Sequence, residues 1–145
     1  MILYVIDASV AARFLLSEDL SDEAGRVLER FMNGFIDLAA PELTIYEIGN
    51  TLWKAFKQGS ITMPEAEEKL SQFLDLRINF IKLNRDDYEK IIEWSAENNM
   101  TYYDGAYVIT SEKVRGIFLT ADDILYEKAS KGIPTLHLRD SNALG

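Results

Sequence analysis

The chain has 145 residues, of which 48% are hydrophobic and 27% charged, as in a single globular domain with its own core. The absence of cysteine excludes disulfide bonds and thiolate chemistry. No apolar run reaches the roughly 18 residues that a membrane span needs, and the first residues lack the basic segment of a signal peptide, so we expect a cytoplasmic protein outside the membrane. The net charge of −9 disfavours a free nucleic-acid binder, unless bound metal ions or a basic partner offset it.

Short apolar runs alternate with longer segments of helical periodicity along the chain. This alternation predicts an α/β fold, with a mostly parallel sheet covered by helices on both faces, in a single domain over residues 1–145. The expected strands are 2–6, 35–39, 79–83, 117–119 and 134–138. The expected helices are 8–16, 21–32, 42–58, 64–76, one that opens at Asp86 or Asp87 and runs to 98, 103–112 and 122–130.

Two acidic residues follow predicted strands. Asp7 comes directly after the first strand, and Asp122 comes shortly after the strand at 117–119. Ligands of open parallel sheets bind beyond the carboxyl ends of the strands. Glu47 and Asp104 would complete a carboxylate cluster there, and such a cluster repels itself unless divalent cations lie between its members. The sequence therefore predicts a metal site suited to phosphate chemistry.

These acids also have structural interpretations. Asp7 or Ser9 could cap the first helix by accepting backbone N–H bonds. Thr120 and Asp123 have the spacing of a capping box, which would give one of them a structural role and leave Asp122 in the first turn near the strand exit. Which of Asp122 and Asp123 faces the metal stays open.

Asp104 lies at the start of a predicted helix, where it could simply complement the helix macrodipole. It is followed by Gly105 and Ala106, whose small side chains would let other groups approach the carboxylate.

Glu47 tests the prediction best, because its helix is amphipathic. On a helical wheel it lies opposite the apolar face, on a polar stripe. The stripe is either a solvated surface or the wall of an open cleft in which Glu47 and Asn50 face a metal. The apolar face comprises Ile45, Ile48, Leu52, Trp53 and Phe56, and the stripe comprises Thr44, Glu47, Asn50, Thr51 and Lys54.

The remaining aromatic and imidazole side chains receive structural assignments. His137 lies in the last predicted strand, away from every carboxylate motif, and is given no role in a site. Trp53, Phe56 and Phe73 are predicted to belong to the core or to a subunit interface.

Taken in order, four short motifs resemble those of the PIN-domain ribonucleases, and most closely the VapC-type toxins of toxin–antitoxin pairs. The resemblance spans nearly the whole chain. The motifs are Val5-Ile6-Asp7-Ala8-Ser9, Pro41-x-Leu43-x-x-x-Glu47-x-x-Asn50, Tyr102-Tyr103-Asp104-x-x-Tyr107 and Leu119-Thr120-x-Asp122-x-x-Leu125.

The resemblance implies a three-layer α/β/α sandwich that acts as a metal-dependent endoribonuclease. It implies that the four acids are catalytic and hold one or two Mg²⁺ or Mn²⁺ ions, supported by two hydroxyls and an amide, and two basic residues are candidate phosphate contacts. The acids are Asp7, Glu47, Asp104 and Asp122, the supporting residues are Ser9, Asn50 and Thr120, and the basic residues are Arg13 and Lys54.

The resemblance further implies three partners, which are an RNA substrate, a small antitoxin and a second copy of the chain that meets the helices at 42–58 and 64–76. Two alternatives stay open, namely a PIN-fold RNA-processing nuclease outside a toxin pair and a catalytically silent PIN-like binding module. Receiver-type phosphoacceptors and haloacid-dehalogenase-type phosphatases fit poorly, because one acid follows the first strand and Ser9 stands where the second acid of Asp-x-Asp would be.

Overall fold

A computed structural model describes residues 1–144, and it contains one five-stranded parallel sheet in the order β3-β2-β1-β4-β5. The strands are β1 (Leu3–Ile6), β2 (Asp37–Pro41), β3 (Asn79–Ile81), β4 (Ile117–Thr120) and β5 (Thr135–His137). The helices are α1 (Ala8–Leu15), α2 (Ser21–Met32), α3 (Leu43–Lys57), α4 (Met63–Asp75), α5 (Arg85–Asn98), α6 (Tyr102–Val114), α7 (Asp123–Ser130) and the 3₁₀ helix η1 (Leu138–Ala143).

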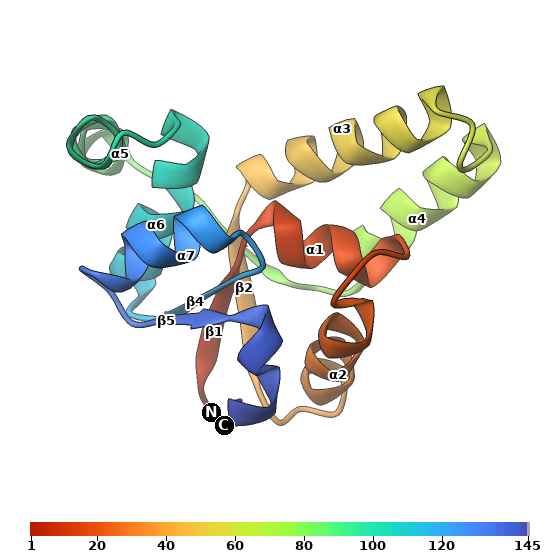
Figure 1. The fold of residues 1–145 in the computed structure, drawn as a ribbon, viewed down its shortest axis with the longest axis horizontal. Coiled ribbons are helices and arrows are strands. Elements are labelled where there is room, and N and C mark those ends of the chain that lie inside the picture. The colour runs from red at the N-terminus through yellow and green to blue at the C-terminus, as the bar shows by residue number, and fades with distance from the viewer. Residues whose placement is uncertain (145) are drawn as a thin grey trace.

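Helices cover both faces of the sheet, as Figure 1 shows, with α1 to α4 on one side and α5 to α7 on the other. Side chains alternate between the faces, because successive residues of a strand point to opposite sides. Tyr4 and Ile6 of β1 belong to the larger core cluster under α1 to α4. Phe118 of β4 packs on Tyr107 beneath α6 and α7. The predicted three-layer α/β/α sandwich is therefore confirmed.

The central strand β1 lies between β2 and β4, so its carboxyl end is at the middle of the sheet. Val5 is in register with Ala39 on one side and with Phe118 on the other. These strands are buried along nearly their whole length, which explains their continuous apolar runs.

Several predicted element boundaries move by one or two residues. β2 begins at Asp37 and not at residue 35, and the ring of Phe35 is exposed. The helix predicted to open at Asp86 or Asp87 begins at Arg85, because Asn84 accepts the Asp87 N–H in a capping box while Asp87 accepts the Asn84 N–H.

Helix α7 also starts one residue later than predicted. It begins at Asp123, because Asp122 is its N-cap and accepts the Leu125 N–H. Within residues 1–144, no helix combines the length and the apolar character that crossing a bilayer would require.

Candidate active site

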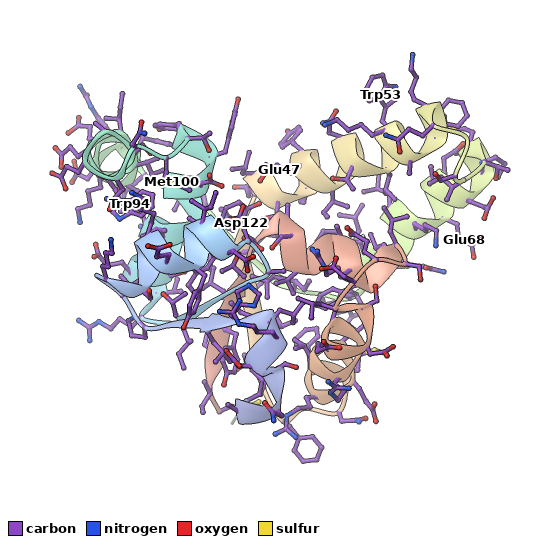
Figure 2. The ribbon with its side chains drawn as sticks, in the orientation of Figure 1. Glu47, Trp53, Glu68, Trp94, Met100 and Asp122 are labelled. Atoms are coloured by element: carbon purple, nitrogen blue, oxygen red, sulfur yellow. The ribbon has the colours of Figure 1, made fainter. Side chains whose placement is uncertain are left out.

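The four candidate acids all lie at the carboxyl edge of the sheet. Asp7 directly follows β1 and Asp122 follows β4, while Glu47 lies in the second turn of α3 and Asp104 in the first turn of α6. Figure 2 shows Glu47 and Asp122 in the same central part of the molecule. Burial is the largest cause of the raised pKa values of Asp7, Glu47 and Asp104, and the negative charges of neighbouring acids add to it. The charge of Asp122 thus acts on Asp7 and on Asp104, and the charge of Asp104 acts on Glu47.

Asp7 is the most enclosed of these acids, with a side chain only 4% exposed. Its Oδ1 accepts hydrogen bonds from the Ser9 hydroxyl at 2.5 Å and from the Val10 N–H at 3.2 Å, and its Oδ2 accepts one from the Thr120 hydroxyl at 2.5 Å. Burial raises the pKa of Asp7 to about 6, although these three donors lower it. Asp7 is thus the N-cap of α1 and a member of the acid cluster at once.

Ser9 and Thr120 join the turn after β1 to the turn after β4. Besides donating to Asp7, Ser9 Oγ accepts the Ala121 N–H at 2.9 Å, and Thr120 Oγ1 accepts the Asp122 N–H at 3.0 Å. The two hydroxyls therefore fix the position of Asp122 relative to Asp7.

Glu47 is held by Tyr107, which belongs to one of the four sequence motifs but was not predicted to have a role. Tyr107 Oη donates to Glu47 Oε1 at 2.5 Å. Burial raises the pKa of Glu47, the Tyr107 hydrogen bond lowers it and the charge of Asp104 raises it further. Burial, followed by the charge of Glu47, raises the pKa of Tyr107, so its hydroxyl stays protonated and able to donate. The signal in the sequence was the spacing from Asp104 to Tyr107, because residues three apart share one face of a helix.

Asp104 and Asp122 are held through the starts of their helices. The Thr101 side chain caps α6 by accepting the Asp104 N–H at 3.1 Å. Burial raises the pKa of Asp104, Thr101 lowers it and the charge of Asp122 raises it again. The small residue after Asp104 serves helix packing, since a Cβ on Gly105 would meet Ser95 Oγ of α5.

Asp123 contacts two residues that follow α7 in the chain, His137 and Arg139. Its Oδ1 lies 2.8 Å from His137 Nε2 and accepts a hydrogen bond from Arg139 Nη1 at 3.2 Å. His137 Nδ1 accepts the Arg139 N–H, so Nε2 carries the hydrogen and donates to Asp123. The prediction that His137 lies away from every carboxylate motif was wrong, because the pairing of β5 with β4 brings it to the start of α7.

The two candidate phosphate contacts have different surroundings. Arg13 donates from Nη1 to the Ser9 carbonyl at 2.7 Å, and from Nε and Nη2 to the carbonyl and carboxylate of Asp19 at 2.8 and 2.9 Å. Its guanidinium therefore stabilises the loop between α1 and α2. Lys54, in contrast, lines a groove of about 410 Å³ together with Glu47 and Asn50.

The polar stripe of α3 borders an open groove, as one of its two interpretations expects. That Glu47 and Asn50 face a metal there stays a prediction. One assignment on the wheel was wrong, because Thr44 is fully buried. Two aromatic residues of the apolar face, Trp53 and Phe56, are 51% and 37% exposed. The groove is lined by Ala8, Leu43, Tyr46, Glu47, Asn50, Thr51, Lys54 and Tyr103.

The donor chemistry of the cluster fits a hard divalent cation, because Mg²⁺ and Mn²⁺ prefer carboxylate oxygens. Asp7 retains acceptor capacity beyond its three donors, since an ionised carboxylate offers about four lone-pair sites. Across residues 1–144, however, no three Asp, Glu or His side chains already converge as a ready ion site. An ion would therefore have to draw the four carboxylates together against their repulsion.

Comparison with known proteins agrees with this architecture. The chain is 30% identical to Ribonuclease VapC3 of Pyrobaculum aerophilum over 128 residues, which cover 86% of this chain and 92% of that protein. It is 30% identical to Exonuclease VapC9 of the same organism over 96 residues, or 66% of this chain and 70% of that protein. A toxin–antitoxin complex from Klebsiella pneumoniae contains a chain of similar fold, with a TM-score of 0.65 and 18% identity over 93% of this chain and 97% of that one. The model of the PIN domain matches residues 4–131, and this chain therefore belongs to the PIN-domain family.

Proposed function

We propose that this protein is a metal-dependent endoribonuclease and the toxin of a type II toxin–antitoxin pair. The observation that carries the proposal is the gathering of Asp7, Glu47, Asp104 and Asp122 at one edge of the sheet, beside an open groove. The 30% identity to Ribonuclease VapC3 over 92% of that protein's length supports the same activity.

In this proposal the four acids are catalytic and hold one or two Mg²⁺ or Mn²⁺ ions. When bound, such an ion lowers the pKa of a water molecule and stabilises the charge that develops on the phosphate. Asp7 is the fixed ligand, because Ser9 and Thr120 hold both of its oxygens. Lys54 and Asn50 line the groove where they would face the phosphate backbone. Attack of water on phosphorus with departure of the 3′-oxygen leaves 5′-phosphate and 3′-hydroxyl ends.

Two protein partners complete the proposal. An antitoxin that places a basic side chain among the acids would relieve their repulsion and block the groove. A second copy of the chain would cover the apolar surface between α3 and α4, where a cavity of about 220 Å³ is lined by residues that include Trp53, Phe56, Met63 and Leu70. The proposed place of action is the cytoplasm.

A second candidate is exonucleolytic cleavage, and the similarity to Exonuclease VapC9 favours it. Circular RNA separates the two activities, because it has no end from which an exonuclease could start.

The test is incubation of purified protein with pooled tRNA and rRNA and with a circular RNA, in Mg²⁺, in Mn²⁺ or in chelator. We expect metal-dependent cleavage of both substrates and none by the Asp104→Asn variant. Cleavage of the linear pool alone would favour the exonuclease. Failure to cut any RNA in either metal would contradict the proposal and favour the silent binding module.

A further inference from the structure

Two exposed tyrosines lie beside the candidate acids, one on each of two helices. Tyr46 directly precedes Glu47 on α3, and Tyr103 directly precedes Asp104 on α6. The two tyrosines are 78% and 57% exposed. Both line the groove of about 410 Å³ that also contains Glu47 and Lys54. The groove thus combines an acid, a cation and two aromatic rings.

Neither ring contributes to the fold through a specific contact. Among residues 1–144, Tyr46 and Tyr103 have no hydrogen-bond, stacking or cation–π partner. The neighbouring Tyr102 differs, because its hydroxyl donates to the Tyr88 carbonyl at 3.3 Å. A ligand that covered the two free rings would recover the free energy that their exposure to water costs.

Electrostatics indicate which part of an RNA would contact this groove. The surrounding carboxylates repel phosphate, and Lys54 is the single cation that lines the groove in the described chain. Arg13 is already bound to the loop between α1 and α2. Phosphate contacts can therefore supply little of the affinity, whereas stacking of a base on an aromatic ring is independent of charge and tolerant of sequence.

We propose that Tyr46 and Tyr103 form a nucleobase clamp, in which unpaired bases on either side of the scissile phosphate stack on the two rings. The clamp rests on the proposed nuclease function, and Tyr46 and Tyr103 are the residues that position the RNA substrate. A base inside a duplex cannot stack on a protein ring without leaving its helix, so the clamp selects unpaired nucleotides.

The binding should also depend only weakly on salt concentration. One phosphate contact, at Lys54, corresponds to a slope of about −0.7 in a plot of log affinity against log salt concentration for a single strand. A groove that depended on many phosphate contacts would give a slope several times steeper.

The experiment measures the stacking directly. The probe is a short single-stranded RNA that contains 2-aminopurine, whose fluorescence is quenched when it stacks, with the same RNA paired to its complement as a second probe. Binding is measured in Mg²⁺ with the Asp122→Asn protein, which the proposed function expects not to cleave RNA, and KM and kcat are measured with the four acids unsubstituted. Tyr46→Ser and Tyr103→Ser remove the rings, Tyr46→Phe and Tyr103→Phe restore them, and Phe35→Ser removes an exposed ring at the opposite edge of the sheet.

We expect the single strand to bind with quenching and the duplex to bind at least tenfold more weakly. Each Ser variant should weaken binding and raise KM by roughly tenfold, with kcat within about twofold, because a stacked base contributes binding energy of that size. The Phe variants and Phe35→Ser should behave as the unsubstituted protein does.

Unchanged affinity and KM in both Ser variants, or equal binding of the duplex, would overturn the clamp. That failure is distinct from failure of the nuclease proposal, which would appear as absence of RNA cleavage by the unsubstituted protein in any metal.

Discussion

Asp7 shows how a single buried carboxylate couples the fold to the site. A carboxyl group with an unfolded pKa of 3.8 and a folded pKa of about 6 favours the folded state when it is protonated. The contribution of Asp7 to stability is therefore greatest below about pH 4 and is lost as the pH rises through 6. Because of the difference between the two pKa values, ionised Asp7 lowers the free energy of unfolding by roughly 3 kcal/mol at neutral pH without metal.

The Asp7→Asn variant should accordingly be inactive and yet more stable than the unsubstituted protein. We expect a gain of about 1–2 kcal/mol at pH 7.5 in chelator, which is less than the full cost because the Asn amide cannot accept all three hydrogen bonds. Urea unfolding at pH 4 and pH 7.5 measures the free energy of unfolding of both proteins, and the gain should vanish at pH 4. A variant less stable at both values would reduce Asp7 to the N-cap of α1.

Tyr107 can be tested apart from its ring, because Phe keeps the packing on Phe118, whose ring centroid lies 6.4 Å away. Tyr107→Phe removes the donor to Glu47, so the pKa of Glu47 should rise further. The acid limb of the pH–rate profile should then move to higher pH and kcat should fall by about tenfold, while stability falls by about 1 kcal/mol. A profile unchanged in shape would limit Tyr107 to a packing role.

At this scale the sequence identified the acids better than it identified their contacts. Asp7, Asp104 and Asp122 stand next to strand ends or helix starts, where position alone makes them candidates. The partners of Asp123 could not be predicted from the sequence, because the pairing of β5 with β4 brings His137 to its carboxylate. That pairing joins residues too far apart in the chain for local patterns to predict.

At the scale of elements, α5 and α6 pack closely at one glycine. A Cβ on Gly105 would lie 3.1 Å from the Ile91 carbonyl and closer still to Ser95 Oγ. Gly105→Ala should therefore destabilise the fold by about 1–3 kcal/mol, despite the higher helix propensity of Ala. The matched control is Gly25→Ala on α2, where an added Cβ would meet no atom within 4 Å beyond its own stretch of helix. There we expect a gain of about 0.5–1 kcal/mol.

Thermal unfolding measures the change in stability of the two Ala variants. It should be a loss for Gly105→Ala and a gain for Gly25→Ala. Equal gains would mean that α5 can shift away from α6 without loss. Activity should fall with Gly105→Ala only, because Asp104 is its neighbour on α6.

The faces of α3 show the limit of prediction for a single helix. Its hydrophobic pattern predicts one continuous buried face, yet Trp53 and Phe56 are partly exposed whereas Thr44 is buried. The reason is that the first turn of α3 packs against the sheet and the last turns extend beyond it with α4, as Figure 1 shows. A helical wheel contains no information on where the partner layer ends.

For the whole molecule, the alternation of strands and helices predicted the three layers, but it could not give the strand order. That order places β1 between β2 and β4, which brings Asp7 between the elements that carry Glu47 and Asp122. The placement of the acids at one edge of the sheet is thus a property of the topology, and the sequence motifs alone could only make it an expectation.

Metal binding should therefore stabilise the entire domain. An ion present at about 100 times its Kd adds about 2.7 kcal/mol to the free energy of unfolding, or roughly 5–10 °C in Tm for a domain of this size. We expect this rise in Mn²⁺ for the unsubstituted protein and for Glu68→Gln, an exposed acid remote from the site (Figure 2). Glu47→Gln should lose most of it. A Tm independent of Mn²⁺ up to millimolar concentration would contradict the metal assignment.

The hydrogen bond from Thr120 to Asp7 spans 113 residues of sequence. During synthesis, Asp7 therefore leaves the ribosome long before Thr120 and Asp122 do. The acid cluster cannot assemble until residues 7 to 122 have emerged and β4 has docked beside β1. A nascent chain that stops short of β4 carries no complete cluster, so the site forms only after translation has passed Asp122.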